Sequence, residues 1–386
     1  MKPATEVLHR GDGEAGRAVP LTTPIYETTT FVFDSADEVK QYNEGKSQKF
    51  LYSRYANPTV TSVERRLAVL EGAEAALVLS SGQAATTTAL LALAGSGDEI
   101  VCSAAIYGGT LHLIADVLPK FGITARFVSL EELRDPGRVL SDRTKLLWFE
   151  SPINPTLRCV DISLVARACR SRGVTSVLDN TFASPINQQP IALGVDVVMH
   201  SATKYLNGHS DVTAGVLAGP KRFIDQMLTL RKLLGAVLDP YAAYALERGL
   251  KTLAVRVERQ NASALAVARF LAADPRVATV YYPGLEQHPE HDIARRQMRG
   301  FGGMVCVDLG GGYERAARFF DRLKVFVRAA SLGGVESLCS LPVLTSQWGH
   351  SEEELARAGV TRSMARLSIG LEDPEDLIAD LDRALQ

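Results

Sequence analysis

Apolar residues recur along this chain in two rhythms, one typical of helices and the other of buried strands. Between Pro58, which can open a helix, and Gly72, which can close it, apolar residues recur at helical spacing. Helical patterns such as Ala84–Ala94 and Leu164–Ser171 separate short apolar runs. We expect these runs to form strands at Ala75–Leu79, Glu99–Cys102, Thr124–Val128, Leu146–Glu150, Ser176–Asp179, Val195–Met199 and Ala214–Leu217. This alternation predicts a largely parallel sheet covered by helices on both faces.

The pattern changes after Tyr241, where a long helical stretch runs to about Ala273. Beyond it we expect strands near Met304–Leu309 and Ala365–Ile369, with helices at Tyr313–Leu323 and Pro374–Ala384. These elements predict a smaller C-terminal α/β domain. We therefore divide the chain into an extended N-terminal arm (1–50), a larger α/β domain (51–245) and a C-terminal domain (246–386). An arm of this kind can dock on a neighbouring subunit.

Composition and charge narrow the class of protein. The 386 residues leave room for two or three domains, and the net charge of −2 favours neither nucleic acid nor an anionic membrane as a partner. No apolar run approaches the roughly 18 residues of a membrane span. The segment Met1–Gly16 lacks the apolar core of a secretory signal, so we expect a cytoplasmic protein. Five cysteines without CxxC spacing predict free thiols and no metal site.

The most informative chemistry lies between Asp179 and Asp211. Lys204 follows an apolar strand and is flanked by Ser201 and Thr203, whose hydroxyls could bind a phosphate. A lysine there suits a Schiff base with a carbonyl cofactor, because its pKa can be lowered. Asp179 ends another buried strand and could keep a pyridinium nitrogen protonated. Either residue alone is more often a solvated lysine or a turn aspartate, but their occurrence together at successive strand ends favours the catalytic interpretation.

Several further motifs occur in a fixed order along nearly the whole chain. They are Pro20-Leu21-Thr22-Thr23-Pro24-Ile25-Tyr26, Tyr52-Ser53-Arg54, Asn57-Pro58-Thr59, Ser201-Ala202-Thr203-Lys204 and Arg366-Leu367-Ser368-Ile369-Gly370-Leu371-Glu372. In these motifs the chain resembles the trans-sulfuration (Cys/Met metabolism) family of pyridoxal-phosphate (PLP) enzymes. The family includes cystathionine γ-synthase, cystathionine γ-lyase and methionine γ-lyase, and the chain resembles the two lyases most. The resemblance implies the aspartate-aminotransferase-like fold (fold type I), with PLP bound by the domain 51–245. It also implies a homo-oligomer that is at least a dimer, and we expect a tetramer.

The resemblance also implies roles at the cofactor. Lys204 would carry PLP, Asp179 would pair with its ring nitrogen, Thr181 would lie beside the ring, and Tyr107 would stack on the ring and act as an acid. The family usually places Met or Leu where this chain has Gln83, a change that a backbone contact tolerates. Phosphate contacts would come from Ser81, Gly82 and Gln83 at a helix start, from Ser201 and Thr203, and from Tyr52 and Arg54 of a neighbouring subunit.

On the substrate side, the resemblance implies that Arg366 binds the α-carboxylate of an amino acid. Asn154 and Ser331 also match family positions near the substrate. Catalysis would rest on Lys204, which moves protons, and on Tyr107, which donates one to the leaving thiolate.

Two positions discriminate among members of the family. Cystathionine-handling members tend to have an acidic residue before Ser331 or beside Tyr52, whereas this chain has Ala330 and Leu51, as in methionine γ-lyases. Against this, methionine γ-lyases commonly have Cys where this chain has Gly109, and the Lys-Asp pair that they often carry is replaced by Arg231-Lys232. We expect α,γ-elimination of methionine or a related homocysteine thioether to 2-oxobutanoate, ammonia and a thiol. The alternatives are a cystathionine γ-lyase and a γ-replacement synthase of the cystathionine γ-synthase or O-acylhomoserine sulfhydrylase type.

Two hypotheses from other functional classes have less support in the sequence. A non-catalytic PLP-binding protein could dispense with Tyr107 and Arg366, and both are present. A dinucleotide-binding module would need a G-x-G-x-x-G motif after the first strand, and the sequence has none there.

Overall fold

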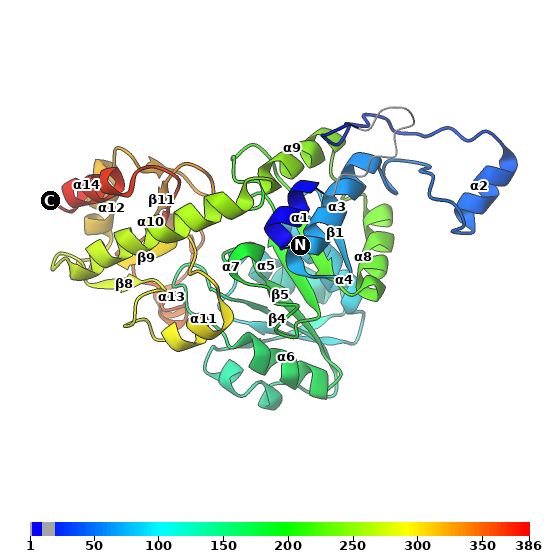
Figure 1. Ribbon diagram of the computed structural model, residues 1–386. Coiled ribbons are helices and arrows are strands. Elements are labelled where there is room, and N and C mark those ends of the chain that lie inside the picture. The colour runs from blue at the N-terminus through cyan, green and yellow to red at the C-terminus, as the bar shows by residue number, and fades with distance from the viewer. Residues whose placement is uncertain (1, 10–19) are drawn as a thin grey trace.

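A seven-stranded sheet forms the centre of the larger part of the molecule in the computed structural model, which describes residues 2–9 and 20–386 (Figure 1). The strand order is β1-β7-β6-β5-β4-β2-β3. β7 runs antiparallel to both of its neighbours, and every other pairing is parallel. The largely parallel sheet is therefore confirmed. The strands are β1 (Ala75–Leu79), β2 (Glu99–Ser103), β3 (Thr124–Val128), β4 (Thr144–Glu150), β5 (Thr175–Asp179), β6 (Val197–Ser201) and β7 (Gly215–Gly219).

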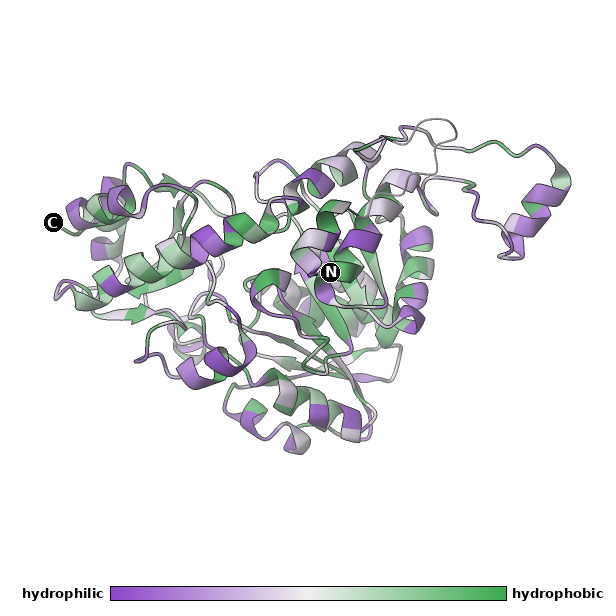
Figure 2. Cartoon of the chain, viewed as in Figure 1, coloured by the Kyte–Doolittle hydropathy of each residue, from purple (hydrophilic) through white to green (hydrophobic). Residues whose placement is uncertain are grey.

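Helices cover both faces of this sheet, because neighbouring strand residues point to opposite sides. Trp148 packs in one hydrophobic cluster with residues of α4 (Gly82–Leu93) and α8 (Lys221–Leu234). The next residue, Phe149, packs in another with α6 (Ile162–Ser171). Figure 2 shows the central strands as mainly hydrophobic and the outer helices as mixed. The remaining helices of this part are α3 (Pro58–Glu71), α5 (Gly108–His112), α7 (Ser184–Asn187) and α9 (Pro240–Leu250).

A second, five-stranded sheet lies in the C-terminal part of the chain. Its order is β10-β11-β12-β9-β8, from β8 (Thr279–Tyr281), β9 (Met304–Asp308), β10 (Val327–Arg328), β11 (Leu338–Ser340) and β12 (Met364–Ser368). The helix α10 (Leu253–Ala273) extends from the larger part towards this sheet (Figure 1) and packs there with α12 (Tyr313–Arg322) and α14 (Pro374–Leu385). Two short helices, α11 (His291–Gln297) and α13 (Glu352–Arg357), complete this part.

The predicted helical stretch from Tyr241 to Ala273 is two helices, not one. α9 ends at Leu250 and α10 begins at Leu253. The Gly249 carbonyl accepts hydrogen bonds from Thr252 Oγ1 at 3.2 Å and from Arg256 Nη2 at 2.9 Å. The break therefore depends on a guanidinium that also binds the Tyr205 carbonyl, a contact invisible to helical periodicity.

The N-terminal segment is less extended than the sequence suggests. α1 (Pro3–His9) packs against α3, with Val7 buried in the same cluster as Leu67. A further helix, α2 (Ala36–Asn43), has no buried residue and projects from the body of the molecule (Figure 1). Residues 1 and 10–19 of the expected arm lie outside the described residues. The boundaries at 50/51 and 245/246 stay predictions.

Two general properties bear on function. Among the described helices, none is both long and apolar enough to cross a membrane. All five cysteines are buried free thiols.

Candidate active site

A cavity of ≈520 Å³ lies where the carboxyl ends of the central strands meet loops of the C-terminal part. Strands β4, β5 and β6 end at Glu150, Asp179 and Ser201, and all three residues line the cavity. Of the residues predicted from the sequence, those in its wall are Ser81, Gly82, Gln83, Tyr107, Asn154, Asp179, Thr181, Ser201, Thr203, Lys204, Ser331 and Arg366. Tyr52 and Arg54 are not in its wall.

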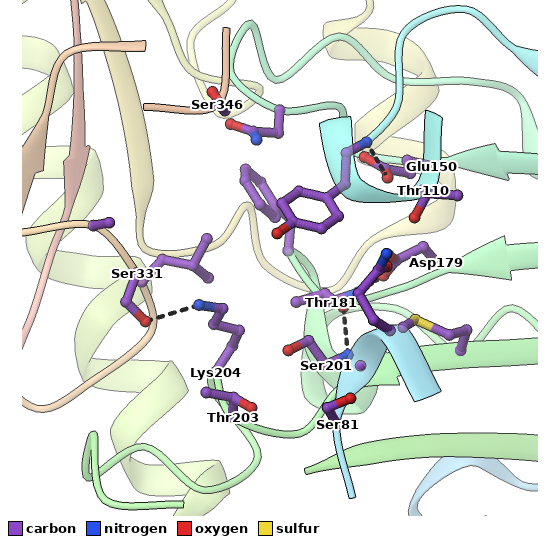
Figure 3. A pocket seen from close by; sticks show the side chains of 18 of the residues that line it. Ser81, Thr110, Glu150, Asp179, Thr181, Ser201, Thr203, Lys204, Ser331 and Ser346 are labelled. Carbon is purple, nitrogen blue, oxygen red and sulfur yellow. Dashed lines mark hydrogen bonds between the residues drawn. The ribbon is translucent and has the colours of Figure 1, made fainter. Parts of the chain in front are cut away.

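Lys204 is the amine of this cavity. Its Nζ donates a hydrogen bond to Ser331 Oγ at 2.8 Å, which links the loop after β6 to the C-terminal part of the chain (Figure 3). Burial, with a smaller contribution from the positive charge of Arg366, lowers the pKa of Lys204 to about 8. About a tenth of the side chain is therefore a neutral, nucleophilic amine at pH 7.

We expect Lys204 to react with acylating reagents at lower pH than the other lysines of the cofactor-free protein. An ordinary lysine has a pKa of 10.5, so the neutral fraction of Lys204 near pH 7 is about 300-fold higher. Competitive labelling with trace acetic anhydride, read by peptide mass spectrometry, should give a half-maximal rate near pH 8 for Lys204. A midpoint above pH 10 would contradict the lowered pKa.

Asp179 shares the floor of the cavity with a second carboxyl group, Glu150. Burial raises the pKa of both, and the carboxyl of Asp179 raises that of Glu150 further. Thr181 opposes this at Asp179, because its backbone N–H donates to Asp179 Oδ1 at 3.0 Å, and the nearby His200 also lowers the pKa of Asp179. These contributions favour Asp179 as the charged member of the pair.

The sequence reasoning did not assign Glu150 to the site. Glu150 ends a predicted buried strand, just as Asp179 does, and this shared position at a strand end could have identified it as a site residue. Glu150 is only 4% exposed, and its Oε1 accepts the backbone N–H of Tyr107 at 2.6 Å. Glu150 thus ties the end of β4 to the segment that carries Tyr107.

The start of α4 forms a cradle for an anion. Ser81 caps the helix by accepting the N–H of Ala84 at 3.0 Å, which leaves the N–H groups of Gly82 and Gln83 at the cavity wall without intrahelical acceptors. A Cβ added to Gly82 would lie 3.0 Å from the Cβ of Ser201, so glycine lets these two segments approach. The hydroxyls of Ser201 and Thr203 line the same cavity.

Arg366 lies on the opposite side of the site, on β12. Its Nη1 donates to Asn154 Oδ1 at 2.9 Å and its Nη2 to the Ser331 carbonyl at 3.1 Å. Arg366 is only 7% exposed, and burial lowers its pKa. No ion pair of the described residues includes it, so this buried guanidinium has neutral partners only and suits a carboxylate from outside the protein.

Tyr52 and Arg54 lie away from the cavity, near the end of α8. Arg54 donates to the Lys232 carbonyl, and its guanidinium lies 4.9 Å from the ring centre of Tyr55. Tyr52 is 37% exposed. Both side chains are therefore available to a surface other than the cavity of their own subunit.

The donor set fits PLP. A lysine with lowered pKa, a charged carboxylate, a helix start and several hydroxyls are the groups that hold an aldehyde, a pyridinium and a phosphate. Two buried hydroxyls in the cavity wall, Thr110 Oγ1 and Ser346 Oγ, have no hydrogen-bond partner among the described residues. No group of three or more His, Cys, Asp or Glu in the described chain could hold a metal ion.

Comparison with known proteins agrees with this chemistry. The family model described as "Cys/Met metabolism PLP-dependent enzyme" matches residues 4–386. Cystathionine gamma-synthase 1, chloroplastic, of Nicotiana tabacum is 42% identical over 98% of this chain and 71% of its own. L-methionine gamma-lyase of Pseudomonas putida is 40% identical over 99% of this chain and 97% of its own. The crystal structure of metB from Corynebacterium glutamicum has a TM-score of 0.93 and 38% identity, and the match covers 100% of this chain and 98% of that one.

Proposed function

The chain belongs to the Cys/Met metabolism family of PLP-dependent enzymes, and from that premise we propose that it is a lyase acting on methionine or a related homocysteine thioether. The reaction is α,γ-elimination. Methionine and one water give 2-oxobutanoate, ammonia and methanethiol. The observation that carries this choice of substrate is the apolar Ala330 in the cavity wall, beside Ser331.

Pyridoxal phosphate, when bound, supplies an electron sink for negative charge at the substrate α-carbon. In this proposal Lys204, Asp179, Thr181 and the start of α4 hold it. Lys204 Nζ removes the α-proton, a role that suits a pKa of about 8. Asp179 would supply the negative charge that keeps the ring nitrogen protonated.

The substrate is oriented by its carboxylate. Arg366 binds that group with its planar fork of donors, and Asn154 and the Ser331 carbonyl hold the guanidinium in place. Tyr107 donates a proton to the leaving thiolate. In this proposal Arg366 therefore orients the substrate, Lys204 removes the α-proton and Tyr107 protonates the leaving group.

The group at the far end of the substrate determines which thioether the cavity binds better. Cystathionine carries an ammonium there, and leaving it without a partner costs roughly 1–3 kcal/mol. The two carboxyl groups of the cavity, Glu150 and Asp179, lie on the opposite side from Ser331, the neighbour of Ala330 (Figure 3). A methyl group has no such cost and gains about 0.8 kcal/mol from burial.

Ala330→Glu should therefore change the preference between substrates. We expect kcat/KM for methionine to fall and that for cystathionine to rise, so that their ratio shifts by about tenfold or more. Ala330→Gln is the matched control, because it adds the same bulk without charge and should lower both values. An unchanged ratio in Ala330→Glu, or a wild-type enzyme that strongly prefers cystathionine, would contradict the proposal.

We propose that the active unit is a homodimer in which Tyr52 and Arg54 reach the phosphate of the neighbouring subunit. Their place outside their own cavity supports this arrangement. In the segment that precedes Tyr52, large apolar side chains are exposed, with Leu21 98% and Val32 87% exposed. A second copy of the chain would cover such residues. A tetramer is the assembly that we expect.

A γ-replacement synthase is the second candidate. The 42% identity to the Nicotiana tabacum synthase is no lower than the 40% identity to the Pseudomonas putida lyase. Gly109, where methionine γ-lyases commonly have Cys, favours this candidate as well. A synthase would consume an activated homoserine ester together with a thiol and release little 2-oxobutanoate from methionine alone.

A further inference from the structure

The amide side chain of Gln83 connects the first turn of α4 to the segment that carries Tyr107. Gln83 Nε2 donates a hydrogen bond to the backbone carbonyl of Gly109 at 2.9 Å. Gly109 lies in α5, whose N-terminal flanking residue is Tyr107. The helix start that offers its N–H groups to the cavity thus also holds the neighbouring wall of the cavity.

Tyr107 is held on its other side by Glu150. Its backbone N–H donates to the buried Glu150 carboxyl at 2.6 Å. The Tyr107 side chain itself is 47% exposed, and no hydrogen bond of its hydroxyl is found within the described part of the chain. The position of the ring therefore depends on how firmly its backbone is fixed.

Gly109 provides the space for this arrangement. A Cβ at position 109 would lie 3.1 Å from Gln83 Nε2 and 2.6 Å from Tyr107 Cε1. The φ of Gly109 is not in the left-handed region, so its backbone conformation does not require glycine. A methyl group here would instead displace the amide of Gln83 or the ring of Tyr107 from the positions that they occupy.

We infer that Gln83 and Gly109 form a matched pair that positions Tyr107 for protonation of the leaving thiolate. Gln83 is a positioning residue, because its side chain acts through Tyr107 and its backbone N–H is a separate contact to the anion cradle. The catalytic consequence rests on the proposed function, whereas the Gln83–Gly109 contact itself does not.

Gln83→Met tests this inference, because methionine has nearly the same length and no donor. Hydrogen exchange of the backbone amides in 107–112 should rise about two- to tenfold in both the cofactor-free and the PLP-loaded protein, as expected for the loss of one hydrogen bond. In the loaded enzyme kcat for methionine should fall by a similar factor, while KM and the dissociation constant of PLP change little. The unaltered backbone N–H at position 83 is the reason for the unchanged PLP affinity.

Gly109→Ala provides the second arm, since the added methyl group displaces both the ring and the amide. If the two positions act as a pair, adding Gln83→Met to Gly109→Ala should lower kcat less than it does in the wild type. Unchanged exchange in 107–112, a fall in kcat explained by weaker PLP binding, or full additivity of the two substitutions would each overturn the inference. If the enzyme does not turn over methionine at all, exchange in the cofactor-free protein still decides whether the contact holds the segment.

Discussion

Replacement of Lys204 by methionine should lower the rate of methionine elimination by a factor of about 10³ or more. Methionine fills a similar volume but has no amine, so the variant lacks both the covalent attachment point for PLP and the group that removes the α-proton. The measurement is kcat with methionine, together with borohydride reduction and peptide mapping of the wild type, which should find the cofactor on Lys204.

A matched control for this variant is Lys221→Met. Lys221 is exposed and pairs with Asp225 on the surface of α8, so its loss should leave the rate unchanged. Label on another lysine, or a Lys204→Met enzyme with a rate close to that of the wild type, would show that the amine has been wrongly assigned.

Arg54→Ala should lower activity by about 10- to 100-fold, the expected cost of losing charge-assisted hydrogen bonds to a phosphate. Mixing Arg54→Ala chains with Lys204→Met chains should then restore activity. In a mixed dimer one site combines the intact Lys204 of one chain with the intact Arg54 of the other. With random exchange half of the dimers are mixed and one of their two sites is intact, so about a quarter of wild-type activity should return.

The control for this experiment is a mixture in which both substitutions are on the same chain and the partner chain is wild type. Its mixed dimers have no site with both residues intact, so random exchange should lower its activity from about a half to about a quarter of the wild-type value, and mass spectrometry of the mixed dimers shows that the subunits have exchanged. If exchange is demonstrated and the two single variants still give no recovery, Arg54 acts within its own subunit.

Local chemistry made much of the site predictable from the sequence. Asp179 ends one predicted strand and Lys204 follows the next, and the carboxyl ends of neighbouring parallel strands meet at one edge of a sheet, so both residues were placed together without a structure. β6 was expected at Val195–Met199 and is found at Val197–Ser201, two residues later, which brings Ser201 into the strand end beside the cavity. The structure places the predicted Arg366 and Ser331 in the same cavity, although Arg366 lies on β12 of the second sheet and Ser331 in the loop between β10 and β11.

What the sequence did not predict depends on contacts between distant residues. The side-chain contact of Gln83 requires α4 and α5 to lie side by side, although the strands that precede them, β1 and β2, are not neighbours in the sheet. Val7 was assigned to an extended arm, yet the contact of α1 with α3 buries it. The helix α8 was not among the predicted elements, although its buried residues Ile224, Met227 and Arg231 recur at helical spacing.

The most direct test of the central claim is an assay of the PLP-loaded enzyme with methionine as the only substrate. Release of 2-oxobutanoate and methanethiol in equal amounts, at a higher kcat/KM than with cystathionine, homocysteine or O-acetylhomoserine, is the result that the proposal predicts. The contrary result is little 2-oxobutanoate from methionine and a thioether formed from O-acetylhomoserine only when a thiol is added. That outcome would identify a γ-replacement synthase in place of a lyase.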